Sequence, residues 1–118
     1  MKIESYRDLI VWQRAIEMTL ALYRLTVDFP REETYGLASQ LRRAGVSVAS
    51  NIAEGYGRSS PREYHQFLGI ARGSNLEIQT QLVIARKLNI GDAGKIETAE
   101  GLSCEIGKML VVLMRKLA

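Results

Sequence analysis

The sequence predicts an all-α protein in which four helices form one antiparallel, up-down-up-down bundle over residues 1–118. Breaks in the pattern fall at FPREE (29–33), EGYGRSSP (54–61) and NIGDAG (89–94). The segments between these breaks carry apolar residues at the spacing of an α-helix, about 3.6 residues per turn. Long helices joined by short loops pack antiparallel. We therefore expect helices at about 6–28, 31–54, 61–88 and 93–117.

The first two helices have recognisable boundaries. The hydroxyl of Ser5 is placed to cap the first helix, with Asp8 as its partner three residues later. That helix ends before Pro30, because a proline disfavours helical geometry in the residue before it. The second helix, over 31–54, is followed by Gly55, which tolerates the left-handed conformation of a C-cap.

The third helix has the strongest local start signal. Ser60 can act as the N-cap, Pro61 fits the first helical position, and Glu63 completes a capping box. Asp92 is placed to cap the fourth helix. Both helices are therefore expected to begin directly after their loops.

Each helix carries one apolar stripe that we assign to the core of the subunit. In the first two helices the stripes are Leu9, Trp12, Ile16, Leu20, Tyr23, Val27 and Leu37, Leu41, Ala44, Val48, Ile52. In the last two they are Tyr64, Phe67, Leu68, Ala71, Ile78, Leu82, Ala85 and Ile96, Ala99, Ser103, Ile106, Leu110, Leu113, Leu117.

The faces opposite these stripes are not polar in the first three helices. The residues that we predict to face outward and to contact other copies of the chain are Val11, Met18, Leu22, Leu25, Val46, Ala49, Gly69 and Gly73. Gly45, Ala53, Leu76, Thr80 and Val83 accompany them. Apolar surface of this extent is typical of a protein interface, so we expect a homo-oligomer. The alternative is a monomer with tilted helices.

Polar residues form a shoulder beside the stripe of the second helix. We predict that they enter the bundle and bond to polar residues of the third helix, because buried polar groups need partners. The members of this structural network are Gln40, Ser47, Asn51, Glu54, Ser74 and Glu77, with Gln81 nearby. The alternative is a solvated edge.

Basic residues gather in the middle of the chain, and all of them are arginine. Guanidinium groups match phosphate geometry, and the loop before the third helix leads to an N-terminus with free amides. The residues predicted to bind nucleic acid are Arg42, Arg43, Arg58, Arg62, Arg72 and Tyr56. Tyr56 and Tyr64 stack bases in this interpretation, or alternatively pack the loop.

Composition and missing motifs exclude several classes. The net charge of +3 favours anionic partners without demonstrating one. We find no metal-binding His pair, phosphate-binding loop or nucleophile motif, and predict no catalytic residue, metal, cofactor or small-molecule substrate. The single cysteine, Cys104, suits a reducing compartment. With no signal peptide and no apolar run of about 20 residues, we expect a cytoplasmic protein that does not enter a membrane.

Three segments, DLIVWQRA (8–15), LYRLTVDFPREETYGLASQLRRAGVSVASNIAEGYGR (22–58) and EYHQFLGIARGSNLEI (63–78), resemble the proteins encoded in intervening sequences of bacterial 23S rRNA genes. The similarity covers nearly all of the chain. It implies an antiparallel four-helix bundle assembled as a ring, typically a pentamer, without enzymatic activity. It also implies distant kinship with the nucleic-acid-binding accessory proteins of diversity-generating retroelements. One departure is Asn75, which stands on a core stripe where the family tends to carry an apolar residue.

The expected function is therefore non-catalytic binding of structured RNA or a ribonucleoprotein by a homo-oligomeric ring. A second hypothesis is a protein–protein scaffold with no contact to nucleic acid. A third, a ribonuclease, needs His65 with Glu63 or Arg62, and the absence of a second histidine makes it the weakest.

Overall fold

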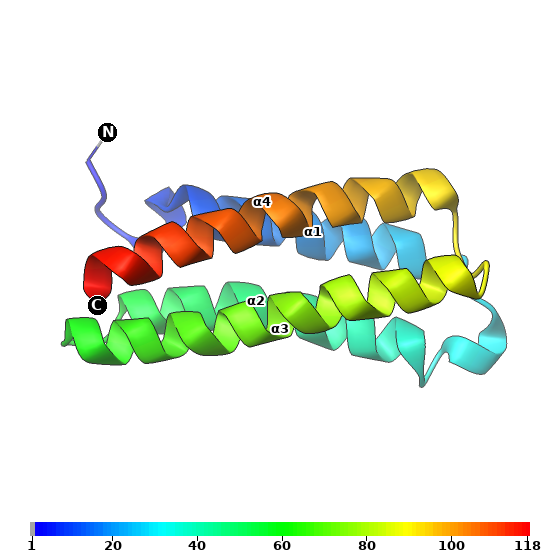
Figure 1. Ribbon diagram of the computed structural model, residues 1–118, viewed down its shortest axis with the longest axis horizontal. Coiled ribbons are helices and arrows are strands. Elements are labelled where there is room, and N and C mark those ends of the chain that lie inside the picture. The colour runs from blue at the N-terminus through cyan, green and yellow to red at the C-terminus, as the bar shows by residue number, and fades with distance from the viewer. Residues whose placement is uncertain (1) are drawn as a thin grey trace.

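Four α-helices and two single turns of 3-10 helix make up the computed structural model, which describes residues 2–118. The elements are η1 (Tyr6–Asp8), α1 (Ile10–Thr26), η2 (Arg31–Glu33), α2 (Leu37–Tyr56), α3 (Pro61–Lys87) and α4 (Ala93–Leu117). They form an elongated bundle of 43 × 24 × 19 Å (Figure 1). The all-α bundle predicted from the sequence is confirmed.

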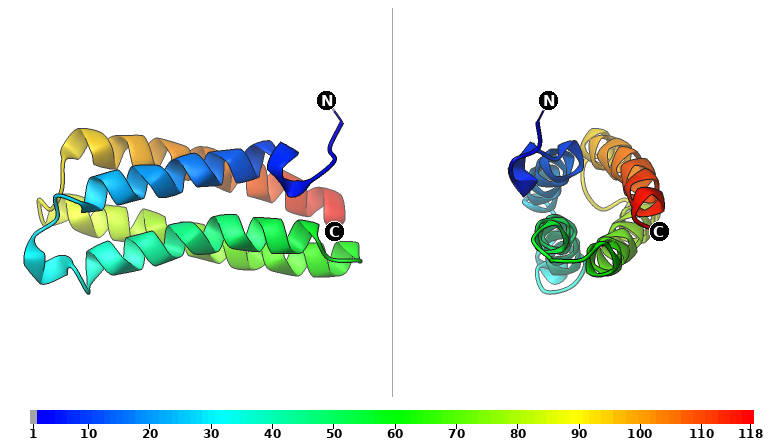
Figure 2. Two further views of the ribbon diagram at one scale, coloured as in Figure 1. Left: turned by 180° about the vertical axis from the view of Figure 1, so that it is seen from behind. Right: turned by 90° about the vertical axis from the view of Figure 1, so that its left-hand side faces the viewer.

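The four helices stand at the corners of a square when the bundle is seen along its axis (Figure 2). Each helix contacts its neighbours in the chain, and α1 closes the square against α4. The bundle therefore has four seams, of which α3/α4 and α1/α4 flank the last helix. Within the part of the chain that is described, no helix has an apolar stretch long enough to cross a bilayer.

The predicted N-caps are present, but two of the predicted helices are divided. Ser5 and Asp8 form the expected capping box around η1, and extended Leu9 separates this turn from α1. The second helix is interrupted at Gly36, so that residues 31–33 form η2 alone. The backbone N–H of Leu37 donates to Glu33 Oε1 (3.0 Å), which caps α2 with a side chain from the preceding turn.

The third and fourth helices begin where the sequence predicts. Ser60 Oγ accepts the N–H of Glu63 (3.2 Å), and Asp92 Oδ2 accepts the N–H of Lys95 (2.9 Å). Gly55 does not cap α2 as predicted: it lies inside the helix, where a Cβ would come within 2.8 Å of Phe67 Cβ. The missing side chain lets α2 and α3 approach closely.

The predicted core face of α1 is wrong for most of the helix. Val11, Met18, Leu22 and Leu25, which were expected to face another copy, are 6%, 0%, 0% and 0% exposed and form part of the subunit core. Of the predicted core stripe, Leu9, Trp12 and Ile16 are half-buried and pack against the core. The other three, Leu20, Tyr23 and Val27, are 49%, 41% and 70% exposed.

Close packing explains the correction. Both faces of α1 carry apolar residues at helical spacing, so periodicity alone cannot choose between them. The buried face contains the small residue Ala15 and meets Gly45 of α2, where a Cβ would lie 3.0 Å from Leu22 Cδ1. Ala49, also predicted to face outward, is buried on the same side of α2 as Gly45.

The outward apolar face predicted for α3 is present. Gly73, Leu76, Thr80 and Val83 are exposed, and a Cβ on Gly73 would meet no atom within 4 Å. Gly69 is half-buried, with Met114 Cε 3.8 Å from the position of its Cβ. On α2, Val46 is exposed as predicted. The core stripes predicted for α2 and α4 are confirmed, as is most of that for α3.

Candidate nucleic-acid interface

Three adjoining hollows form a groove along the α3/α4 seam. Their volumes are about 450, 270 and 670 Å³, taken from the middle of the seam to the end at which α4 ends. The first two share Arg72, Val111 and Arg115, and the last two share His65 and Ala118. We call this continuous surface the seam groove.

Basic side chains line the seam groove over its whole length. Arg62, His65 and Arg72 come from α3, and Lys108 and Arg115 from α4. None of the lining residues is acidic, and none of the five takes part in an ion pair within residues 2–118. The unpaired arginine and lysine cations on the two facing helices, Arg62 and Arg72 on α3 and Lys108 and Arg115 on α4, favour an anionic ligand between them.

A buried polar pair forms the floor of the groove. Asn75 Nδ2 donates to the carbonyl oxygen of Ser103 (3.0 Å), and Ser103 Oγ donates to Asn75 Oδ1 (2.8 Å). Gly107 lies beside them, with the position of its Cβ 3.4 Å from Asn75 Nδ2. This pair accounts for an asparagine on the core stripe of α3, because both side chains are satisfied and α3 is fixed against α4.

The arginines predicted to form one surface are divided among separate places. Arg42 is directed to the α1/α2 seam, where Nε donates to Thr26 Oγ1 (2.7 Å) and the guanidinium carbon lies 4.7 Å from the centre of the Tyr23 ring. Arg58 pairs with Glu54 (3.7 Å) and lies 4.6 Å from the centre of the Phe67 ring.

Only two of the five predicted arginines reach the seam groove. These are Arg62 and Arg72, whereas Arg43 is exposed on α2. Arg42 lies on α2, which ends at Tyr56, and at 1.5 Å per residue the end of that helix is roughly 20 Å from Arg42. Arg58 follows that end. The structure therefore does not bring the five arginines together on one surface, because residues close in sequence are directed to different seams.

Tyr56 packs the turn between α2 and α3. Its ring meets that of Tyr64 edge to face, with the centroids 6.1 Å apart. Burial raises the pKa of the Tyr64 hydroxyl, with a smaller contribution from Tyr56. Of the two interpretations of these tyrosines, loop packing accounts for the observed contact.

The polar network predicted between α2 and α3 is present in part. Ser47 Oγ bonds to Ser74 Oγ (2.9 Å), Asn51 Nδ2 donates to the carbonyl oxygen of Ser47 (2.8 Å), and Gln81 Nε2 donates to Gln40 Oε1 (3.2 Å). Glu54 and Glu77 do not join it: Glu54 pairs with Arg58, and Glu77 is exposed.

Sequence reasoning missed the basic residues of α4. Lys108 and Arg115 lie seven residues apart, which places them on one side of a helix. The chain has no acidic residue after Glu105, whereas Lys108, Arg115 and Lys116 follow it. This change in charge was the available signal, and it was outweighed by the denser run of arginines between 42 and 72.

The fold and groove define a class: an all-α, antiparallel four-helix bundle with a basic groove along one seam. The chain belongs to the 23S rRNA-intervening sequence protein family, whose model matches residues 7–112. The family resemblance predicted from the sequence is confirmed. No curated protein matches the sequence at a significant level.

A solved structure supports the same fold. A crystal structure from Bacteroides thetaiotaomicron, described as a protein with unknown function from the S23 ribosomal protein family, is similar with a TM-score of 0.79. The two sequences are 23% identical, and the match covers 90% of this chain and 96% of the other. At that identity the likeness establishes the bundle and nothing about the ligand.

Proposed function

We propose that this protein is a non-catalytic, oligomeric RNA-binding bundle that holds the phosphate backbone of structured RNA in the seam groove. The observation that carries the proposal is the arrangement of Arg62, His65, Arg72, Lys108 and Arg115 along one seam whose lining contains no acidic residue. Because the family is named for intervening sequences of 23S rRNA, ribosomal RNA is the first nucleic acid to test.

The lining of the groove favours structured RNA over an unstructured strand. Proteins that bind single strands stack bases on aromatic side chains. The seam groove contains no Phe, Tyr or Trp, and the turn tyrosine Tyr56 packs against Tyr64 instead. Its charged groups are suited to phosphates, which a folded RNA presents along its helices.

Assembly increases the affinity of such a site. The outward face of α3, with Gly73, Leu76 and Val83, is the surface that we propose for contact between copies. A ring, for which the family resemblance implies a pentamer, repeats the groove in each subunit, so that weak phosphate contacts add by avidity. Val83→Glu is expected to reduce the mass measured by light scattering while circular dichroism still reports the helices.

Salt dependence is the direct test of phosphate binding. Filter binding of a labelled 23S rRNA hairpin is expected to weaken with a log–log slope of about −4, one counterion for each of about four contacts. From 50 to 200 mM salt the affinity then falls by about 10²-fold. Oligouridine of equal length should bind more weakly at every salt concentration.

A matched pair of variants locates the site. Arg72→Glu/Arg115→Glu should abolish retention of the hairpin at 100 mM salt, because it places two anions in the groove. Arg24→Glu/Lys87→Glu changes the net charge equally at exposed positions outside the groove and should retain most of the binding. Equal losses in the two variants would show that only net charge matters.

The second candidate function is a protein–protein scaffold, and the apolar surface beside the start of α1 favours it. A pull-down separates the two functions. Recovery that survives nuclease treatment supports the scaffold, and recovery that nuclease abolishes supports RNA binding.

A further inference from the structure

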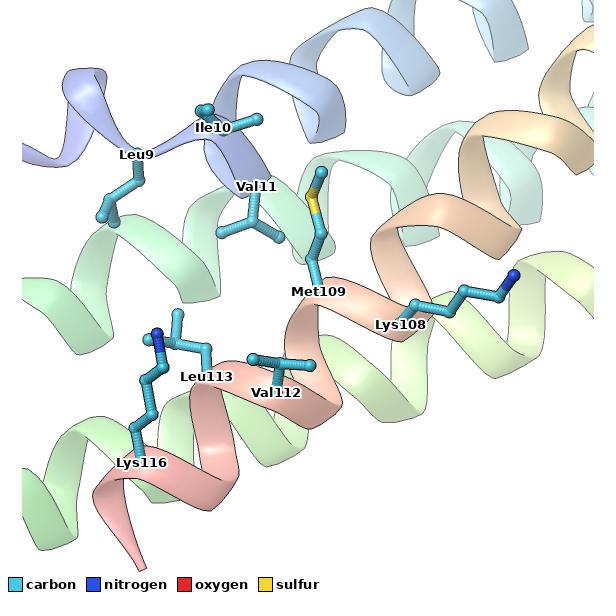
Figure 3. A pocket seen from close by; sticks show the side chains of 8 residues that line it. All are labelled: Leu9, Ile10, Val11, Lys108, Met109, Val112, Leu113 and Lys116. Atoms are coloured by element: carbon cyan, nitrogen blue, oxygen red, sulfur yellow. The ribbon is translucent and has the colours of Figure 1, made fainter. Parts of the chain in front are cut away.

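The α1/α4 seam carries a second groove of different character. Leu9 and Val11 from the start of α1 face Met109 and Leu113 of α4 across a hollow of about 420 Å³ (Figure 3). These residues pack against the core, so the floor of the hollow is apolar and well supported. We call it the apolar groove.

The rim of the apolar groove is apolar as well. Ile10 and Val112 line it and are 53% and 50% exposed. A hollow of this volume is at the small end of the range for small-molecule pockets, roughly 300–1,000 Å³, and such pockets bury most of their ligand. With half-exposed apolar residues on its rim, the groove needs a wider cover, and an amphipathic helix supplies one.

Two lysines flank the apolar side chains and indicate the charge of the partner. Lys108 and Lys116 extend from α4 on either side of the groove (Figure 3). Eight residues at 1.5 Å each separate them by roughly 12 Å along the helix. No acidic residue lines the groove, and neither lysine is in an ion pair within the described chain.

We propose that the apolar groove binds an amphipathic helix of another protein, one whose apolar anchors lie between two acidic residues seven or eight positions apart. The anchors cover Ile10, Val112 and the floor, and the carboxylates meet Lys108 and Lys116. The inference does not require RNA binding in the seam groove, although Lys108 and Val112 line both grooves.

The chain itself does not supply that helix. Two acidic pairs have the required spacing: Asp92 with Glu100, and Glu97 with Glu105. The large apolar residue between the members of the first pair is Ile96, which is buried in the core. Between those of the second pair it is Leu102, which is half-buried and packs against the core of its own subunit. In addition, Arg86 already bonds Glu100 and Arg14 already bonds Glu105, both at 2.6 Å. The apolar residues between these acidic pairs are therefore not free to enter the groove, and Glu100 and Glu105 already have partners. A different protein is thus a better match to the groove than a second copy of this chain.

A selection experiment tests the partner chemistry with the full chain as bait. The probe is a phage-displayed library of helical peptides, selected on the wild-type protein and counter-selected on Val112→Glu. Retained peptides are expected to carry Leu, Ile, Met or Phe at spacings of three and four, with Asp or Glu on both sides. A synthetic copy of the strongest peptide is then measured by fluorescence anisotropy.

Charge exchange provides the decisive comparison. Lys108→Glu/Lys116→Glu should lower the affinity for the selected peptide by about tenfold or more. A peptide in which lysines replace the acidic residues should bind that variant more tightly than the original peptide does. Leu20→Glu is the matched control, since Leu20 is 49% exposed and lies outside the groove. It should bind the original peptide as the wild type does.

Three results would overturn the proposal. The first is a selection that yields no peptide preferring the wild type to Val112→Glu. The second is a set of binders without acidic flanks, or binders indifferent to the charge exchange. The third is a mass, measured by light scattering, that falls in Val112→Glu but not in Leu20→Glu, which would assign the groove to a second copy.

Discussion

The two grooves beside α4 differ in what their floors and walls are made of. On the α3 side, a buried Asn75–Ser103 pair lies under arginine side chains, with no Phe, Tyr or Trp in the lining. On the α1 side, Met109 and Leu113 lie under an apolar rim, and charge is confined to two lysines. One helix thus separates a surface suited to phosphates from one suited to an apolar helix.

The difference shows how one helix can serve two kinds of recognition. Successive residues of α4 differ by about 100° in direction, so neighbours in sequence are directed to different seams. Arg115 lines the seam groove, whereas Lys116 lines the apolar groove. Lys108 and Val112 line both, because they lie on the ridge between the seams. The comparison therefore predicts residue-specific effects on each side.

The largest expected effect is the loss of stability when a residue beneath one of the two grooves is replaced. Asn75→Ala should lower the free energy of unfolding by about 2–3 kcal/mol, because it removes two bonds and leaves the buried Ser103 hydroxyl without its acceptor. Met109→Ala on the apolar side should cost about 1 kcal/mol, since that side chain is only half-buried. Urea unfolding of the two variants measures the difference.

A double-mutant cycle identifies the cause. If the polar pair carries the effect, Asn75→Ala and Ser103→Ala should couple by about 1 kcal/mol, because the second change costs little once the first partner is gone. Strictly additive losses would mean that the bond from the Ser103 hydroxyl does not determine the cost. The cost would then come from the cavity left by the amide or from its bond to the Ser103 carbonyl oxygen, which Ser103→Ala keeps. If Met109→Ala lowers the free energy of unfolding more than Asn75→Ala does, the polar pair is not the more important of the two for stability.

Much of the bundle was predictable from sequence, and the failures have a physical pattern. The caps at Ser60 and Asp92 are local hydrogen bonds, so local sequence suffices. The core faces of α2 and α4 were predicted correctly because apolar stripes at helical spacing marked them. On α1, both Met18 and Leu20 lie on apolar stripes, and only the packing partner distinguishes them.

The candidate site was less predictable than the fold for a related reason. The arginine-rich stretch predicted one surface, but a seam is made by two helices that are distant in sequence. Arg72 and Arg115 are brought together only because α3 and α4 are neighbours in the square. Arg42, although it belongs to the same stretch, is directed to Tyr23 and Thr26 across another seam. Sequence clustering therefore could not identify the groove.

An intermediate effect is expected from single charge reversals along α4. Arg115→Glu should lower the affinity for RNA about fivefold and leave the affinity for an acidic helix in the apolar groove unchanged. Lys116→Glu should lower the affinity for the acidic helix about fivefold and leave the affinity for RNA unchanged. Lys108→Glu, on the ridge between the seams, should lower the affinity for each ligand by a similar factor. A fivefold loss corresponds to about 1 kcal/mol of binding free energy. Filter binding and fluorescence anisotropy on the same preparations measure the two ligands. If the affinities for RNA and for the acidic helix fall equally in all three variants, the two sides of α4 are not separate sites.

The smallest expected effect concerns a glycine on the wall of the seam groove. Gly107→Ala should raise the free energy of unfolding by about 0.5–1 kcal/mol, because alanine favours a helix interior and its Cβ would sit 3.4 Å from Asn75 Nδ2, an ordinary contact. The same methyl group narrows the seam groove and should lower the affinity for RNA about twofold.

Gly101→Ala is the matched control for that change, since its Cβ would meet nothing within 4 Å and it lies on the same helix outside both grooves. It should give the same gain in thermal stability with unchanged RNA affinity. A gain in stability from both variants, with a loss of affinity in Gly107→Ala alone, separates the shape of the groove from the stability of α4. Equal affinities would mean that the ligand does not enter the groove as deeply as Gly107 and is held by the charged rim alone.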